Sequence, residues 1–162
     1  MVLDYQLIVK ILNQLISMSP KHFLKEIEMG RIAGPFNERP FTNWRLSPIG
    51  VVRKNLHPQH LSFPLGKSVN DGIDPVFSTV QYTSFDKVLD SVAKLGRNTL
   101  LAKMDILSAF RLLILHPSDF ELFGFKFKNQ FYFDKCLPMG CSVSCSLFEK
   151  FASFLEWALR SA

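Results

Sequence analysis

The sequence predicts an α+β fold, because segments with helical spacing of apolar residues are combined with a β-hairpin pattern. Helical spacing occurs near the N-terminus, over residues 80–95 and over residues 142–162. The hairpin pattern covers residues 122–137. A length of 162 residues with 48% hydrophobic residues suits one globular domain with a core.

The first helical regions are short and end at helix-breaking residues. An N-terminal helix is predicted before Pro20, and a second one should end at Gly30. A longer helix over residues 80–95 should end at Gly96. The apolar residues that define these three helices are Leu7, Ile8, Ile11, Leu12 and Leu15, then Phe23, Leu24 and Ile27, then Phe85, Val88, Leu89 and Val92.

The region from residue 34 to residue 72 is rich in turn-forming residues. It contains Pro35, Pro40, Pro48, Pro58 and Pro64. Proline lacks a backbone N–H and interrupts regular structure, so only short extended pieces such as residues 49–52 are expected here.

After Gly96 the apolar pattern changes to one that favours strands. Residues 99–106 are predicted to form a strand with Asp105 near its end. The two halves of the hairpin, 122–127 and 131–137, flank Lys128-Asn129-Gln130, and Phe123, Phe125 and Phe127 should share one face. An amphipathic helix of about 20 residues should follow, from Ser142 to Ala162.

Charge and cysteine content narrow the partners and the compartment. The net charge of +5 and the pI near 9.2 suit a polyanionic partner without identifying one. Three cysteines and no secretory signal favour reduced thiols inside a cell. Polar residues interrupt the apolar segment 2–18, so neither a signal peptide nor a membrane span is expected.

Several ordered motifs resemble those of reverse transcriptases, specifically those of DIRS-like (tyrosine-recombinase) retrotransposons. The resemblance covers about Lys25 to Trp157 and is densest from Lys103 onward. The motifs are Lys103-Met104-Asp105-Ile106 with Ser108-Ala109-Phe110-Arg111, His116-Pro117, Phe123-Gly124-Phe125 and Leu137-Pro138-Met139-Gly140. They are preceded by Gly30-Arg31-Ile32-Ala33-Gly34-Pro35-Phe36, Ser47-Pro48-Ile49-Gly50-Val51-Val52 and Ser68-Val69-Asn70-Asp71-Gly72-Ile73.

The resemblance implies an RNA-directed DNA polymerase that uses magnesium, a primer–template of RNA or DNA, and deoxynucleotides. Two magnesium ions about 4 Å apart clamp the attacking and leaving oxygens in such enzymes, which requires converging carboxylates. Asp105 matches the first catalytic carboxylate and metal ligand, and the Ile106 carbonyl is a second candidate metal ligand. The alternative role of Asp105 is to cap a turn or a helix.

Five further positions match nucleotide-binding residues of the family. Phe110 matches the ring beneath the nucleotide sugar that excludes a 2′-hydroxyl, and Ala109 is the small residue beside it. Met139 and Gly140 match the turn before the palm helix, and Lys54 matches a lysine that grips the triphosphate. Core packing is the alternative for Phe110, and solvation is the alternative for Lys54. The arginine expected soon after Lys54 is missing from residues 55–60.

By this resemblance the chain divides into an N-terminal helical segment (1–24), a fingers subdomain (25–96) and a partial palm subdomain (97–162) with an incomplete ferredoxin-like (RRM-like) sheet. The paired aspartates of the family do not occur, because the sequence contains no Asp-Asp. The chain is therefore interpreted as an N-terminal fragment that is inactive alone. Asp119, Asp134 and Glu149 are expected to be solvated rather than to replace the missing pair.

Two other functions remain open. One is a noncatalytic nucleic-acid-binding or host-adapted protein that kept the polymerase fold. The other is a zinc-binding interaction module, for which the candidate ligands are His57, His60, Cys136, Cys141 and Cys145. The cysteines lack a Cys-x-x-Cys pair, which weakens the zinc hypothesis.

Overall fold

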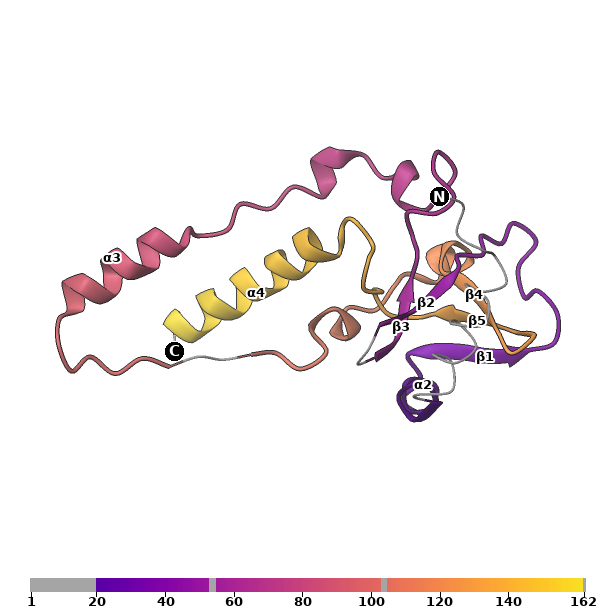
Figure 1. Cartoon of the computed structure of the whole chain (residues 1–162), viewed down its shortest axis with the longest axis horizontal. Helices are drawn as coiled ribbons and strands as arrows, with labels where there is room; N and C mark the ends of the chain where they lie inside the picture. The colour runs from indigo at the N-terminus through magenta and orange to yellow at the C-terminus, as the bar shows by residue number, and fades with distance from the viewer. Residues whose placement is uncertain (1–19, 53–54, 103–104, 162) are drawn as a thin grey trace, which may run out of the picture.

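A computed structural model describes residues 20–52, 55–102 and 105–161 of the chain. It contains helices and a three-stranded antiparallel sheet in the order β1-β5-β4, which agrees with the predicted α+β class. The sheets lie at one end of the molecule, α3 (Phe85–Leu95) lies at the opposite end, and α4 (Ser144–Ser161) lies between them (Figure 1). The predicted helix over residues 7–15 lies outside the described residues.

The hairpin is confirmed as β4 (Gly124–Phe127) and β5 (Gln130–Asp134). Phe127 faces Gln130 across the turn, and the two residues between them, Lys128 and Asn129, have φ values of 46° and 64°. Two consecutive residues with positive φ make the tight turn whose twist matches that of the flanking strands.

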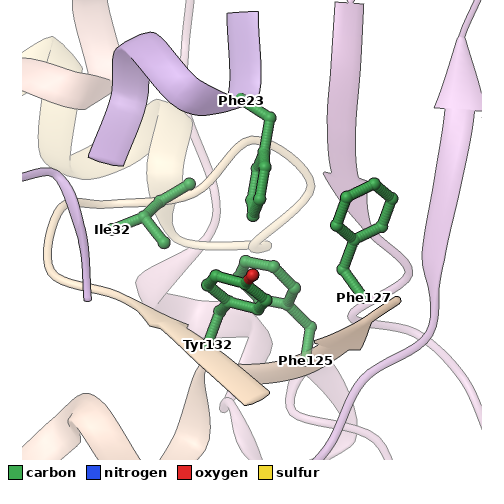
Figure 2. Close-up of a cluster of buried hydrophobic side chains, with 5 residues drawn as sticks. All are labelled: Phe23, Ile32, Phe125, Phe127 and Tyr132. Carbon is green, nitrogen blue, oxygen red and sulfur yellow. The ribbon is translucent and has the colours of Figure 1, made fainter. Parts of the chain in front are cut away.

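The third strand, β1 (Ile32–Phe36), pairs with β5, and α2 (Pro20–Glu28) covers one face of this sheet. Figure 2 shows Phe23 of α2 pointing at the side chains of the sheet. Its ring lies 5.0 Å from the rings of both Phe127 and Tyr132, in edge-to-face geometry. Phe125 and Ile32 complete this buried cluster. The predicted second helix, α2, therefore covers the main core.

The opposite face of the sheet is also aromatic. Phe133 contacts the rings of Phe36, Phe41 and Phe120 at centroid distances of 5.1 to 5.7 Å. Both faces of β5 are therefore covered, which explains why its side chains are buried or half-buried along its whole length.

A second, two-stranded sheet pairs β2 (Ile49–Val52) with β3 (Asn55–Gln59). The predicted extended piece at residues 49–52 is thus confirmed. Gln59, the last residue of β3, links the two sheets because its side-chain amide donates to the Phe123 carbonyl and to Asp134, both at 2.9 Å. Phe123 packs with Leu61, Val69 and Cys141, a cluster separate from that of Phe125 and Phe127.

The two long helices lie away from the sheets, and long irregular segments connect α3 to the rest of the chain (Figure 1). The helix predicted over 80–95 begins only at Phe85 (α3, Phe85–Leu95), because Ser84 caps its N-terminus by accepting from the Lys87 N–H. α4 (Ser144–Ser161) confirms the predicted amphipathic helix. None of the helices in the described ranges is long and apolar enough to cross a membrane.

The predicted strand over residues 99–106 is wrong. Residues 99–102 and 105–106 form neither strand nor helix, and Leu100 and Leu101 are exposed. The segment beside the end of β5 is instead Leu113–Leu115: the Leu115 N–H donates to the Lys135 carbonyl and the Leu137 N–H donates to the Leu113 carbonyl. A strand needs a neighbouring strand for its backbone groups, and β5 already pairs with β1 and β4 on its two edges.

Candidate nucleotide site

Asp105 is exposed in an irregular segment that leads into a short 3-10 helix, η3 (Ala109–Leu112). Ser108, just before η3, has the left-handed conformation with φ of 55°. The turn at Ser108 separates the exposed carboxylate from the half-buried residues Ala109 and Phe110. Asp105 therefore caps no described helix, and its carboxylate remains accessible to a ligand.

Phe110 contacts the long helix α4. Its ring meets the Phe148 ring edge-to-face with a centroid distance of 5.8 Å. The residue as a whole is half-buried. The packing role and the sugar-contacting role considered for Phe110 are thus compatible.

Arg111, the next residue, is the centre of a buried ionic cluster. Its Nη1 lies 2.7 Å from Asp134 Oδ1, and its Nε donates to Glu26 Oε2 at 2.9 Å. The guanidinium also donates to the carbonyls of Cys136 (3.2 Å) and Arg31 (3.4 Å). Arg111 therefore attaches η3, and with it the Asp105–Phe110 segment, to α2 and β5.

The expected solvation of Asp134 is wrong, because its side chain is fully buried. Burial raises the pKa of Asp134 to about 7, and the Arg111 guanidinium opposes this shift without cancelling it. The Arg111 pKa is raised by Asp134 and Glu26, against the effect of its own burial. Asp119 and Glu149 are half-buried.

The Met139–Gly140 turn lies just before α4. Met139 is 60% exposed, and Gly140 has φ of 93°, a conformation that favours glycine. The turn is held from both sides: the Ser144 hydroxyl donates to the Pro138 carbonyl at 2.8 Å, and the Asn70 amide donates to the Gly140 carbonyl at 2.9 Å. Sequence reasoning missed Asn70 although its motif had been identified.

The predicted site residues are thus only partly brought together. η3 contacts α4 through Phe110, and the Met139–Gly140 turn leads directly into α4, so both groups are arranged around the start of one helix. Asp105 and Ile106 precede η3 as an exposed pair. Lys54 lies outside the described residues.

The residues of this region could supply some of the ligands of a magnesium ion. The Asp105 carboxylate and the Ile106 carbonyl are hard oxygen donors of the kind that magnesium prefers. Among the described residues, no group of three or more His, Cys, Asp or Glu side chains could hold a metal ion. The same finding gives the zinc hypothesis no support within the described ranges, where Cys136 and Cys141 are buried and Cys145 is exposed.

Comparison with protein families matches residues 40–162 to the family described as reverse transcriptase (RNA-dependent DNA polymerase). No curated protein and no solved structure matches the chain. The matched range covers more than half of the sequence and includes Asp105, Phe110 and the Met139–Gly140 turn. The chain belongs to the reverse transcriptase family, whose complete proteins carry out template-directed DNA synthesis.

Proposed function

We propose that this chain is part of the reverse transcriptase of a DIRS-like (tyrosine-recombinase) retrotransposon and takes part in DNA synthesis by two-metal nucleotidyl transfer. The observation that carries the proposal is the family match over residues 40–162, within which Asp105 is an exposed carboxylate beside η3. The order of the motifs from Gly30 to Gly140 supports the retrotransposon type.

Each candidate residue has one task in this proposal. Asp105 and the Ile106 carbonyl hold magnesium, which when bound supplies positive charge against the triphosphate. Phe110 lies under the sugar, Ala109 is the small residue beneath the nucleotide, and the Met139–Gly140 turn faces the base pair that is being formed. Lys54 contacts the triphosphate as a flexible point charge.

The fingers (25–96) and palm (97–162) assignment belongs to the same proposal. β1 comes from the first of these ranges and pairs with β5 from the second, so a single sheet joins them. An intracellular site of action and a primer–template partner follow from the proposed reaction. The basic net charge of +5 supports a partner that carries phosphates.

Binding of a nucleotide to the primer–template complex tests the function without requiring turnover. The probe is a fluorescent RNA–DNA primer–template, and its affinity for the chain is measured by anisotropy with magnesium and with a matched or a mismatched deoxynucleotide. We expect the matched nucleotide to tighten the complex. The matched nucleotide should raise the affinity at least about tenfold, because charge-assisted contacts are worth about 1.5–3 kcal/mol. Asp105→Asn should abolish this gain in affinity.

The matched control is Asp86→Asn, which removes the same charge from an exposed position on α3. Equal behaviour of the two variants would contradict the role of Asp105. If the parent chain binds the primer–template without distinguishing nucleotides, the noncatalytic nucleic-acid-binding function becomes the better description.

A further inference from the structure

The side chain of Asn70 makes three hydrogen bonds that connect two distant parts of the chain. Its Nδ2 donates to Ser62 Oγ at 2.8 Å and to the Gly140 carbonyl at 2.9 Å. Its Oδ1 accepts from the Ser142 N–H at 2.9 Å. One carboxamide thus holds the backbone on both sides of Cys141, about 70 residues away in sequence.

The backbone that carries Asn70 is itself fixed. The Asn70 N–H donates to the Leu61 carbonyl at 3.0 Å, and Asn70 opens the 3-10 turn η1 (Asn70–Gly72). Next to it, Asp71 Oδ2 accepts from both the N–H and the hydroxyl of Ser68, at 2.8 and 2.7 Å. These bonds lower the Asp71 pKa because they stabilise its carboxylate form.

The held segment is the turn that enters α4. The neighbouring residue Val69 is buried in the same cluster as Cys141, so the two loops also share apolar contacts. A carboxamide offers two donor hydrogens and an acceptor in one plane, and no other short side chain provides both. The Asn70 carboxamide therefore helps to hold the path of the chain from Gly140 to Ser142.

We propose that Asn70 is a positioning residue, which holds the Met139–Gly140 turn in the shape that receives a nucleotide. Asn70 acts through the backbone of the turn, by its bonds to the Gly140 carbonyl and the Ser142 N–H. The identity of the ligand rests on the proposed function. The hold of Asn70 on the turn rests only on these contacts.

Cys141 is a built-in reporter of this turn. Its side chain is 5% exposed, Cys136 is 7% exposed at the Arg111 cluster, and Cys145 is exposed on α4. The native chain is treated with iodoacetamide, and the alkylation rate of each cysteine is followed by peptide mass spectrometry. Each rate is divided by the rate for the same cysteine in urea-unfolded protein, which removes differences in intrinsic thiol reactivity.

We expect a graded, local response. Asn70→Ala removes three hydrogen bonds and should raise the Cys141 rate by about tenfold or more. Asn70→Asp keeps the acceptor for the Ser142 N–H, and Ser62→Ala removes one bond only, so both should give smaller increases. The rate of Cys136 should not change, and Asn43→Ala, at an exposed turn position, is the control.

Two results of the alkylation experiment would overturn the proposal. One is equal labelling of Cys141 in Asn70→Ala and Asn43→Ala. The other is a parallel rise at Cys136 and Cys141, which would make Asn70 a general stabiliser of the fold. Ser62→Ala and Asn70→Asp keep the test decisive if Asn70→Ala does not fold.

The nucleotide arm separates the two proposals. With the primer–template probe, Asn70→Ala should weaken the effect of the matched deoxynucleotide by about tenfold, and Asn70→Asp should restore part of it. If Cys141 is alkylated faster in a variant than in the parent, but the matched deoxynucleotide still tightens the complex as much as in the parent, the positioning role is overturned. If the parent shows no nucleotide effect, the proposed function fails, while the order of Cys141 rates still decides whether Asn70 holds the turn.

Discussion

Arg111 and Asp134 form an ion pair of 2.7 Å in which the aspartate is fully buried and the arginine is 15% exposed. The pair joins η3 to the end of β5, 23 residues further along the chain. Glu26 and the Gln59 amide bind the same cluster from α2 and β3. A buried charge is costly unless it is paired, so this cluster fixes how four elements meet rather than adding much net stability.

Stability should fall as the pH rises from about 4 to about 7. Burial raises the Asp134 pKa from 3.8 to about 7, so the folded state holds a proton there that the unfolded chain has released. The contribution is complete below about pH 4 and lost as the pH passes about 7. Over this interval the free energy of unfolding should drop by at most about 4 kcal/mol, at 1.36 kcal/mol for each pKa unit. Urea denaturation at several pH values measures it.

The Asp134→Asn variant should show a much flatter pH profile over the same interval, because the side chain no longer titrates. Asp90→Asn, on the exposed helix α3, should keep the parental slope. A parental slope that survives in Asp134→Asn would assign the pH dependence to other groups.

A methyl group at position 124 should displace Trp44. A Cβ built on Gly124 would overlap the Trp44 indole, and Gly124 is buried at the start of β4. Gly124→Ala should therefore cost about 1–3 kcal/mol of stability, as overpacking of a core does. Thermal unfolding measures the loss, and tryptophan fluorescence should report the altered surroundings of Trp44. Gly72→Ala, where the added Cβ meets nothing within 4 Å, should be nearly neutral.

The local pattern of apolar and turn-forming residues predicted the elements that depend on interactions between residues close in sequence. The β4–β5 hairpin, α2 and α4 follow from alternation, helical spacing and turn residues, because those preferences act within a few residues. The strand predicted around Asp105 is wrong because a strand also needs a partner that sequence pattern does not supply: β5 pairs with β1 and β4 on its two edges, and Leu113–Leu115 lies beside the residues that follow β5.

The polar contacts of the site were not predictable for the same reason. The burial of Asp134 depends on Arg111 and Gln59, and the role of Asn70 depends on Gly140 and Ser142, all brought close only by folding. One signal was available for Asp134: it follows Tyr132 by two residues in an alternating strand, which places it on the same face as Tyr132, the face covered by α2.

The chain should self-associate through α4. Phe154 and Trp157 are 57% and 63% exposed, and their rings pair with each other on the helix surface. Large exposed apolar side chains favour association. Size-exclusion chromatography with light scattering should show oligomers, and Phe154→Glu with Trp157→Glu should shift them toward monomer. Ser153→Glu adds charge on the same helix without removing apolar surface. A parental chain that is a monodisperse monomer would contradict this expectation.

Purified residues 1–162 should not extend a primer. The chain carries Asp105 but no Asp-Asp pair, and no group of three ligands occurs in the described residues. Loss of part of a metal clamp costs several kcal/mol, and each 1.4 kcal/mol lowers the rate about tenfold. Extension above the level without enzyme, measured on a labelled primer–template, would refute this prediction.

The roles of Asp105 and Phe110 can be separated in an active chimera. In it, a related reverse transcriptase supplies the segments after Trp157 and an arginine-bearing fingers strand. Asp105→Asn removes a charge but little volume, so extension should fall at least about a hundredfold, which corresponds to about 2.7 kcal/mol. Folding and primer–template binding should persist, as circular dichroism and anisotropy would show.

Phe110→Ala should fail differently, because it opens space without removing a charge. Deoxynucleotide extension should largely survive, and ribonucleotides should be incorporated as well. Phe148→Ala is the matched control, since it removes the same ring contact, worth about 0.5–1.5 kcal/mol, but leaves the Phe110 ring in place. If Phe148→Ala admits ribonucleotides equally, or if Phe110→Ala loses stability without any change in sugar choice, Phe110 acts by packing against α4. If Asp105→Asn extends primers at a near-parental rate, Asp105 is not a metal ligand.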